Sequence, residues 1–103
     1  MRFRRIYWVT EQIDEGGASE VTGVFTSIPD LIELGLGVRE ISAKRAGFRL
    51  SLCELDCSGM PLITLASPGF EDFEAKLTPF LNTGEISREE FNTLADALQA
   101  RAI

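Results

Sequence analysis

The amino-acid sequence predicts an α+β fold: an antiparallel sheet of three to four strands with helices on one face and a C-terminal helical hairpin. Three observations predict this class. Residues 1–66 contain four segments of strand-like composition and one short helical segment, whereas residues 67–103 have helical spacing of apolar residues. Consecutive strands are joined mainly by turns, which favours antiparallel pairing. The 103 residues suit a single domain with a modest core.

The first two strands should form a hairpin. Residues 3–10 are rich in aromatic and β-branched side chains, as a strand requires. A polar loop over residues 11–20 turns at residues 14–17, and residues 21–26 return as the second strand. We expect an antiparallel hairpin with a long, mobile tip.

A short helix should follow the hairpin. Ser27 is placed to cap it, and Asp30 puts a carboxylate near the positive end of the helix dipole. Gly35 and Gly37 keep this helix short, and residues 39–47 connect it to the next strand. The apolar residues expected on one face of the helix are Leu31, Leu34 and Val38.

Residues 48–55 predict a third, half-buried strand, because apolar and polar side chains alternate along them. Residues 56–59 supply a turn, and residues 60–66 return as a fourth strand. Pro61 cannot donate a ladder hydrogen bond, so we expect this strand at an edge of the sheet.

Two helices are predicted after the strands. Ser67 and Pro68 mark the start of the first, and Pro79 should end or kink it. The stripe expected on this helix is Phe70, Phe73 and Leu77.

The last helix has the strongest local signal. Ser87 and Glu90 match a capping box, and Ile86 and Phe91 are spaced as a hydrophobic staple. The residues expected along its apolar face are Phe91, Leu94, Ala95 and Leu98.

Charge and hydropathy limit the partners. The net charge is −6, which disfavours general nucleic-acid binding because phosphate backbones are also negative. No apolar run approaches the roughly 20 residues that span a bilayer, and residues 6–9 are too short a run for a signal-peptide core. We therefore expect a cytoplasmic protein without a membrane partner.

The chain has two cysteines and no histidine, which limits its chemistry. On one straight strand the Cα atoms of Cys53 and Cys57 would lie about 13 Å apart, whereas a disulfide needs less than about 7 Å, so we expect thiols. A zinc site normally needs four ligands, and we expect neither metal nor cofactor. Cys53 lacks a histidine base. With Glu54 and Asp56, which alternation places on one strand face, it forms an alternative site for a small ligand or for catalysis.

Basic residues near the first helix leave one question open. Arg39, Lys44, Arg45 and Arg49 could form a phosphate-binding patch beside Gly35-Leu36-Gly37. Phosphate-binding glycines precede a helix, however, and these follow one, so we interpret them as helix termination.

Two segments resemble known families. Residues 6–56 carry IYWV, an acidic glycine-containing loop, TGVFTSIPDLIE and ELD, and this segment resembles small uncharacterised bacterial and phage α+β proteins. Residues 77–98 resemble a short helical hairpin at the C-termini of many bacterial proteins. The matching positions are Gly84, Ile86, Ser87, Glu90 and Phe91. This second resemblance implies oligomer formation.

Our functional interpretation is a non-catalytic protein-interaction or regulatory module that forms a homodimer. Its strands carry apolar side chains on both faces, but few helices are available to cover them. Tyr7 and Trp8 point to opposite faces of the first strand, so one belongs to the core and the other to a surface that meets a partner. The candidate interface residues are Tyr7, Trp8 and Phe91.

Overall fold

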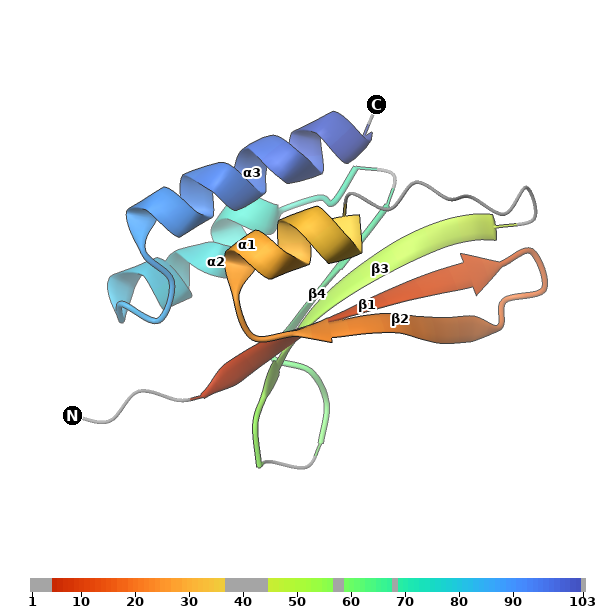
Figure 1. Ribbon diagram of the computed structural model, residues 1–103, viewed down its shortest axis with the longest axis horizontal. Helices are drawn as coiled ribbons and strands as arrows, with labels where there is room; N and C mark the ends of the chain where they lie inside the picture. The colour runs from red at the N-terminus through yellow and green to blue at the C-terminus, as the bar shows by residue number, and fades with distance from the viewer. Residues whose placement is uncertain (1–4, 37–44, 57–58, 68, 103) are drawn as a thin grey trace.

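The computed structural model describes residues 5–36, 45–56, 59–67 and 69–102. Its elements, in chain order, are β1 (Ile6–Asp14), β2 (Ser19–Phe25), α1 (Ile28–Asp30), η1 (Leu31–Leu36), β3 (Arg45–Glu54), β4 (Ile63–Ala66), α2 (Phe73–Asn82) and α3 (Arg88–Ala102). The strands form one antiparallel sheet in the order β2-β1-β3-β4, and the helices lie on one face of it (Figure 1). The predicted α+β class is therefore confirmed.

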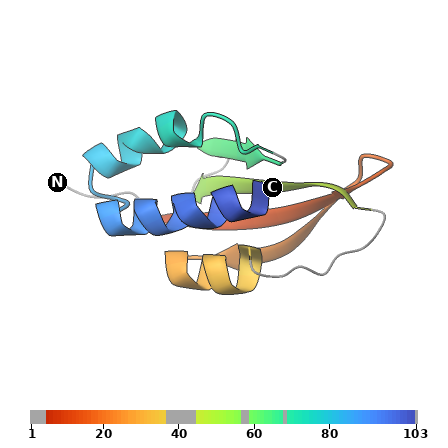
Figure 2. The same ribbon diagram turned by 90° about the horizontal axis from the view of Figure 1, so that it is seen from above.

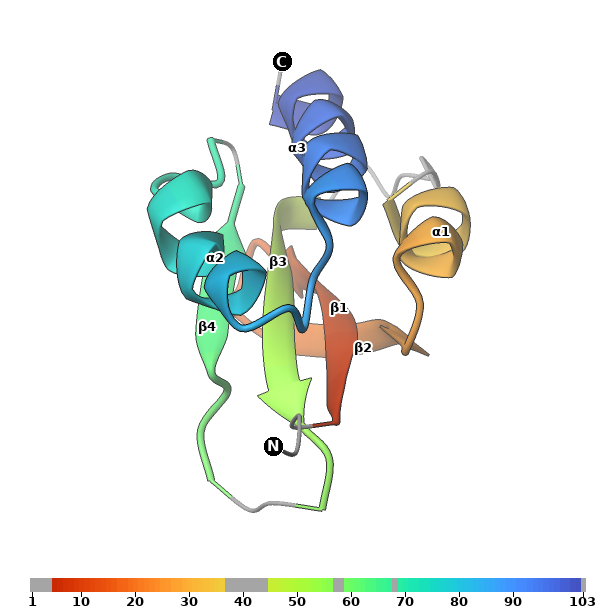
Figure 3. The same cartoon turned by 90° about the vertical axis from the view of Figure 1, so that its left-hand side faces the viewer.

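The helices lie beside one another over the sheet. Seen from above, α3 runs between α2 and the helical segment α1–η1 (Figure 2). The end view shows the same arrangement, with α2 near β4 and α1 near β2 (Figure 3). The two edges of the sheet are therefore each accompanied by a different helix.

The β1–β2 hairpin is longer than the sequence predicted. The expected long loop over residues 11–20 is wrong, because the two strands stay paired almost to the turn. Asp14 closes this turn: its Oδ1 accepts hydrogen bonds from the backbone N–H groups of Gly16 (2.9 Å) and Ala18 (3.0 Å). Gly17 has a φ of +90°, which glycine adopts without strain. The polar composition reflects an exposed strand end, not a loop.

The ring of Phe25 fits against two glycines where β2 meets η1. A Cβ atom on Gly23 would lie 2.6 Å from this ring, and a Cβ atom on Gly35 would lie 2.8 Å from it. A larger residue at either position would require the ring to move, because protein interiors are close-packed. The two glycines therefore allow η1 to pack closely on β2.

The helix after the hairpin is wider than predicted. Ser27 caps it as expected, since its Oγ accepts a backbone N–H from the first turn at 3.2 Å. The helix then continues as a π-helix, in which hydrogen bonds span five residues. Leu31 and Leu36, five residues apart, are therefore buried, whereas Leu34 is 58% exposed. The prediction that Leu34 faces the core is wrong for this reason, and Val38 lies outside the described residues.

The α2 helix begins later than its Ser-Pro signal predicted. Phe70 and Asp72 have φ angles of 48° and 65°, so the backbone before Phe73 is not helical. Pro79 lies inside α2, and the helix ends three residues after it instead of at the proline.

The start of α3 agrees with the sequence. The Oγ of Ser87 accepts the backbone N–H of Glu90 at 3.1 Å, and Oε1 of Glu90 accepts the backbone N–H of Ser87 at 2.9 Å. Ile86 and Phe91 are both buried, as a hydrophobic staple requires. The rings of Phe73 and Phe91 stack with centroids 5.8 Å apart, which joins α2 to α3. The capping box is confirmed, and the helical hairpin as a packed unit stays a prediction.

One hydrophobic core lies between the sheet and the helices. The strands contribute Trp8, Phe48, Leu50, Leu52 and Leu65, and the helical segments contribute most of the rest. The fourth strand is an edge strand, as Pro61 predicted, although it begins only at Ile63. Because all described helices lie on one side, this core accounts for only one face of the sheet.

Candidate interaction surface

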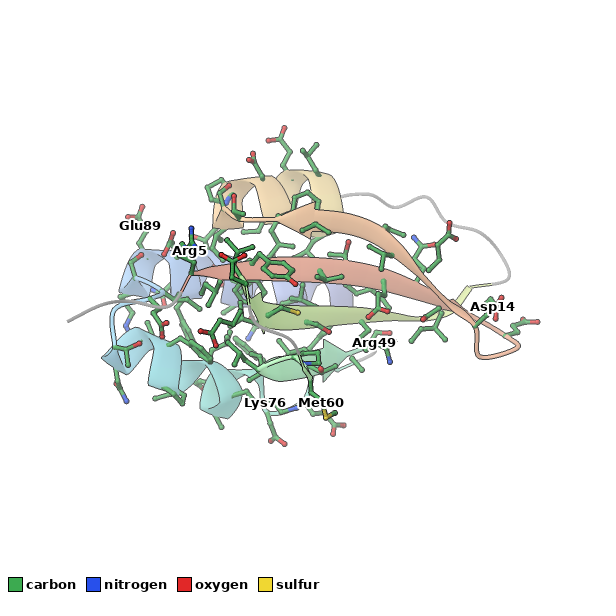
Figure 4. The ribbon with its side chains drawn as sticks, turned by 90° about the horizontal axis from the view of Figure 1, so that it is seen from below. Arg5, Asp14, Arg49, Met60, Lys76 and Glu89 are labelled. Atoms are coloured by element: carbon green, nitrogen blue, oxygen red, sulfur yellow. The ribbon has the colours of Figure 1, made fainter. Side chains whose placement is uncertain are left out.

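The face of the sheet that points away from the helices is not covered by any described element. Figure 4 views the molecule from this side, with the side chains of the strands toward the reader. Side chains alternate along β1: Trp8 and Thr10 are 2% and 0% exposed in the core, so Tyr7, Val9 and Glu11 project from the other face.

Strand register arranges the side chains of this face in rows that cross the strands. The first, the valine row, consists of Val24, Val9, Ser51 and Thr64, in the order β2-β1-β3-β4. The second, the ion-pair row, consists of Val21, Glu11, Arg49 and Ala66 in the same order. Beyond the valine row lie Tyr7 and Cys53, and beyond the ion-pair row lie Ser19, Ile13 and Gly47. We call these residues together the open face.

The two halves of the open face differ in side-chain size. The β1–β2 half carries the bulky apolar residues Tyr7, Val9, Ile13, Val21 and Val24. The β3–β4 half carries, besides Arg49, the small residues Gly47, Ser51, Cys53, Thr64 and Ala66. Val21 and Val24 are 56% and 59% exposed, so one half is a raised apolar surface and the other is a lower one.

Glu11 and Arg49 form a bidentate ion pair in the middle of the open face. Arg49 Nε donates to Oε1 of Glu11 at 2.9 Å, and the Arg49 Nη2 donates to Oε2 at 3.2 Å. The side chain of Glu11 is only 17% exposed. The hydrogen bonds from Arg49 lower the pKa of Glu11, against the effect of burial, and the pKa of Arg49 is raised by the same bonds. The two charges therefore neutralise each other at the centre of the face.

Acidification should destabilise the domain partly through Glu11. Because the folded pKa of Glu11 lies below its unfolded value, the ion pair stabilises the protein fully above about pH 4.3 and is lost as the pH falls through the folded pKa. The Glu11→Gln variant has no carboxyl group to protonate at this position, so this part of the acid-induced loss of stability should be absent. We expect its drop in unfolding free energy between about pH 7 and about pH 3 to be smaller than that of the wild type by up to about 1 kcal/mol. Urea unfolding of both proteins at both pH values measures the difference, and equal drops would contradict it.

Tyr7 and Cys53 are direct cross-strand neighbours on the open face, and each side chain affects the pKa of the other. Burial raises the pKa of the Cys53 thiol, and the nearby Glu11 carboxylate raises it further, which together outweigh the opposite effect of the Tyr7 hydroxyl. The pKa of Tyr7 is also raised, first by the adjacent Cys53. Cys53 therefore stays a protonated thiol at neutral pH, which is not the state of a nucleophile.

The three residues of the predicted alternative site do not converge. Cys53 lies on the open face, whereas Glu54 pairs with Ile6 in the alternation of the helix-covered face. Asp56 has a φ of 61° and pairs with Arg5 at 2.6 Å. The prediction that Glu54 and Asp56 share one strand face is wrong, because β3 ends at Glu54 and the alternation ends with it.

The three predicted interface residues also separate. Trp8 and Phe91 are 2% and 4% exposed in the core, so neither can contact a partner in the folded chain. Tyr7 lies on the open face and is only partly buried. The expectation that one of Tyr7 and Trp8 belongs to the core is confirmed.

The described residues do not decide whether a basic phosphate-binding patch forms, a question that the sequence left open. Arg39 and Lys44 lie outside the described residues, as does the side chain of Arg45. The second cysteine, Cys57, also lies outside them. Arg49 is described, and its guanidinium is bound to Glu11.

A shallow depression of about 340 Å³ lies between β4 and the start of α2. Its lining includes Thr64, Glu71, Asp72 and Lys76. The Lys76 amine donates to the backbone carbonyl of Thr64 at 2.9 Å, so it covers the β4 edge. Among the described residues, no three or more metal-binding side chains gather in one place. No helix in the described part of the chain is long and apolar enough to cross a membrane.

The sequence analysis missed the most informative residues of the open face. Glu11 and Arg49 are far apart in the chain, and only the β1–β3 register brings them together. Val21 and Val24 are three residues apart, so strict alternation would place them on opposite faces of the sheet. Both project outward because the β1–β2 register shifts between Thr10 and Glu11. The sequence signal that pointed to this face was the run of apolar residues at the start of β1, which places Ile6 and Trp8 on one face and Tyr7 and Val9 on the other.

Comparison with known proteins does not add a relative. No family model, curated protein or solved structure matches the chain. The resemblances of residues 6–56 and 77–98 therefore stay predictions, and a function has to be argued from the open face itself.

Proposed function

We propose that the chain is a non-catalytic protein-interaction module that binds its partner through the open face of the sheet. One observation carries the proposal: on the face opposite the helices, β1 and β2 present neighbouring apolar side chains, and Val21 and Val24 among them are more than half exposed. Exposed apolar surface of this kind marks interaction sites in folded proteins. We place the module in the cytoplasm, where Cys53 would remain reduced.

The charge of the open face supports binding to protein. The chain as a whole carries −6, but the open face holds one carboxylate and one guanidinium that neutralise each other. Interface centres are depleted in charged residues and enriched in aromatic residues; the two charges of this face are paired with each other, and Tyr7 stands at one end of it. A partner would therefore meet a neutral, largely apolar surface.

Photo-crosslinking in the cells that make this protein tests the proposal. Benzoylphenylalanine placed at Val24 on the open face should give a protein adduct of defined mass on irradiation. The matched control is the same residue at Glu89, which is exposed at the start of α3 on the helical side (Figure 4). The absence of an adduct from position 24, or the same adducts from both positions, would contradict the proposal.

The alternative function, a ligand site or an enzyme built on Cys53, Glu54 and Asp56, has no observation in its favour. The three side chains diverge, and the thiol pKa is raised.

A further inference from the structure

We infer that the partner is a second copy of this chain, packed with its open face against the open face of the first. The two copies are related by a two-fold axis that lies between the two sheets, runs parallel to the strands and passes midway between β1 and β3. The inference rests on the proposed function, since it takes the open face to be a binding surface. It adds the identity of the partner and the orientation in which the copies meet.

Charge complementarity is the first argument. A two-fold axis in this position places β1 of one copy over β3 of the other and keeps each row opposite itself. Glu11 and Arg49 occupy the same row, on β1 and β3. Glu11 of each copy then faces Arg49 of the partner subunit, and four charges of alternating sign form one neutral cluster. Each carboxylate already accepts two hydrogen bonds within its own chain, which limits the cost of removing it from water.

Side-chain size gives the second argument. The same axis lays the raised β1–β2 half of one copy over the lower β3–β4 half of the other. Val24 would lie over Thr64 of the partner subunit, and Val21 over Ala66 of the partner subunit. Packed sheets lie about 10 Å apart with interdigitating side chains, so large residues opposite small ones fill the space evenly.

The other face-to-face symmetry does not fit. A two-fold axis perpendicular to the strands would put β2 over β2 and reverse the order of the rows. With the axis midway between the two rows, Glu11 would meet Val9 of the partner subunit, and with the axis on the ion-pair row, Glu11 would meet Glu11 of the partner subunit. Exposed valines would also meet across β2 while the small residues faced each other and left a gap. The sequence of the open face is therefore self-complementary for one axis and not for the other.

The area of the open face sets the expected strength of dimer formation. Four strands about 5 Å apart, over about seven residues of about 3.3 Å each, give roughly 400 Å² of sheet plane per chain. Specific interfaces begin near about 500 Å² of accessible surface per partner. The dimer should therefore be of the weak class, dissociating on dilution.

Charge complementation tests both the partner and the axis. Glu11→Lys makes the ion-pair row doubly positive, and Arg49→Glu makes it doubly negative. Sedimentation equilibrium should show wild-type mass rising with concentration from 11.4 kDa toward twice that value. Each reversed variant should self-associate at least about tenfold more weakly, because like charges would face each other. An equal mixture of the two variants should regain the wild-type association, since the positive row of one variant then faces the negative row of the other.

Asp56→Lys is the matched control. It changes the charge by the same amount as Glu11→Lys but acts on an exposed ion pair outside the open face, so association should not decrease. Circular dichroism establishes that each variant is folded. If a reversed chain does not fold, Glu11→Gln and Arg49→Gln replace the pair, and their mixture should again associate more strongly than either alone, because it restores one inter-subunit ion pair.

The outcomes separate this inference from the proposed function. The wild type could stay monomeric up to millimolar concentration while position 24 still crosslinks to another protein. This result would contradict the inference that the partner is a second copy, but it would agree with the proposed interaction module. A dimer that Glu11→Lys and Arg49→Glu do not weaken, or one that the mixture does not restore, overturns the axis. A monomer without any crosslink from position 24 overturns both proposals.

Discussion

Trp8→Ala should lower the free energy of unfolding by about 3–5 kcal/mol, which is a large part of the stability of a domain this size. Trp8 is 2% exposed and packs in the core beneath the helices, next to β3 through Leu52. Removing the indole would leave a cavity that the surrounding side chains cannot fill. Urea unfolding at a concentration where the protein is monomeric measures the loss.

Tyr7→Ala is the matched control, because the two residues are adjacent on β1 and point to opposite faces. Tyr7 is only partly buried, so its removal should cost less than that of Trp8, about 1 kcal/mol. The pair decides which aromatic residue belongs to the core. A greater loss from Tyr7→Ala than from Trp8→Ala would mean that the helices cover the other face of the sheet.

Phe91→Ala should also cost about 3–5 kcal/mol. The ring is 4% exposed and stacks on the ring of Phe73 with centroids 5.8 Å apart. The Cζ atom of the Arg88 guanidinium lies 5.5 Å from the centroid of the Phe91 ring. The stacking on Phe73 holds the first turn of α3 against α2, and the Arg88 contact lies within α3. We expect urea unfolding to show the loss and sedimentation to show unchanged dimer formation in whatever fraction remains folded.

Asn92→Ala is the control for this position, because Asn92 follows Phe91 on α3 and is exposed. Its effect should stay within about 0.5 kcal/mol. If Phe91→Ala left stability unchanged and abolished self-association, Phe91 would be the interface residue that the sequence first suggested.

Local signals predicted most of the fold. The Ser87–Glu90 capping box, the Ser27 cap and the edge position of the strand after Pro61 depend on residues a few positions apart, and all three agree with the structure. The predictions from sequence were wrong where the backbone departs from the regular geometry of an α-helix. The π-helical turn exposed Leu34, and left-handed residues before Phe73 delayed α2.

The open face was only half predictable. Alternation along β1 separates Tyr7 and Val9 from Trp8, but it does not say which set the helices cover. That choice depends on the packing of the whole core. The Glu11–Arg49 pair depends on the β1–β3 register, and the outward position of Val21 depends on a register shift. Neither is visible in a short stretch of sequence.

The valine methyl groups give the most direct test of the central claim that the open face is the binding surface. The chain has four valines, and three of them, Val9, Val21 and Val24, lie on this face. In the methyl NMR spectrum of valine- and leucine-labelled protein, their signals should shift progressively as the concentration rises. Signals from the core leucines Leu77 and Leu94, which are 0% exposed, should stay in place. Valine signals that do not move while the sedimentation mass doubles would contradict the account, because the copies would then meet elsewhere.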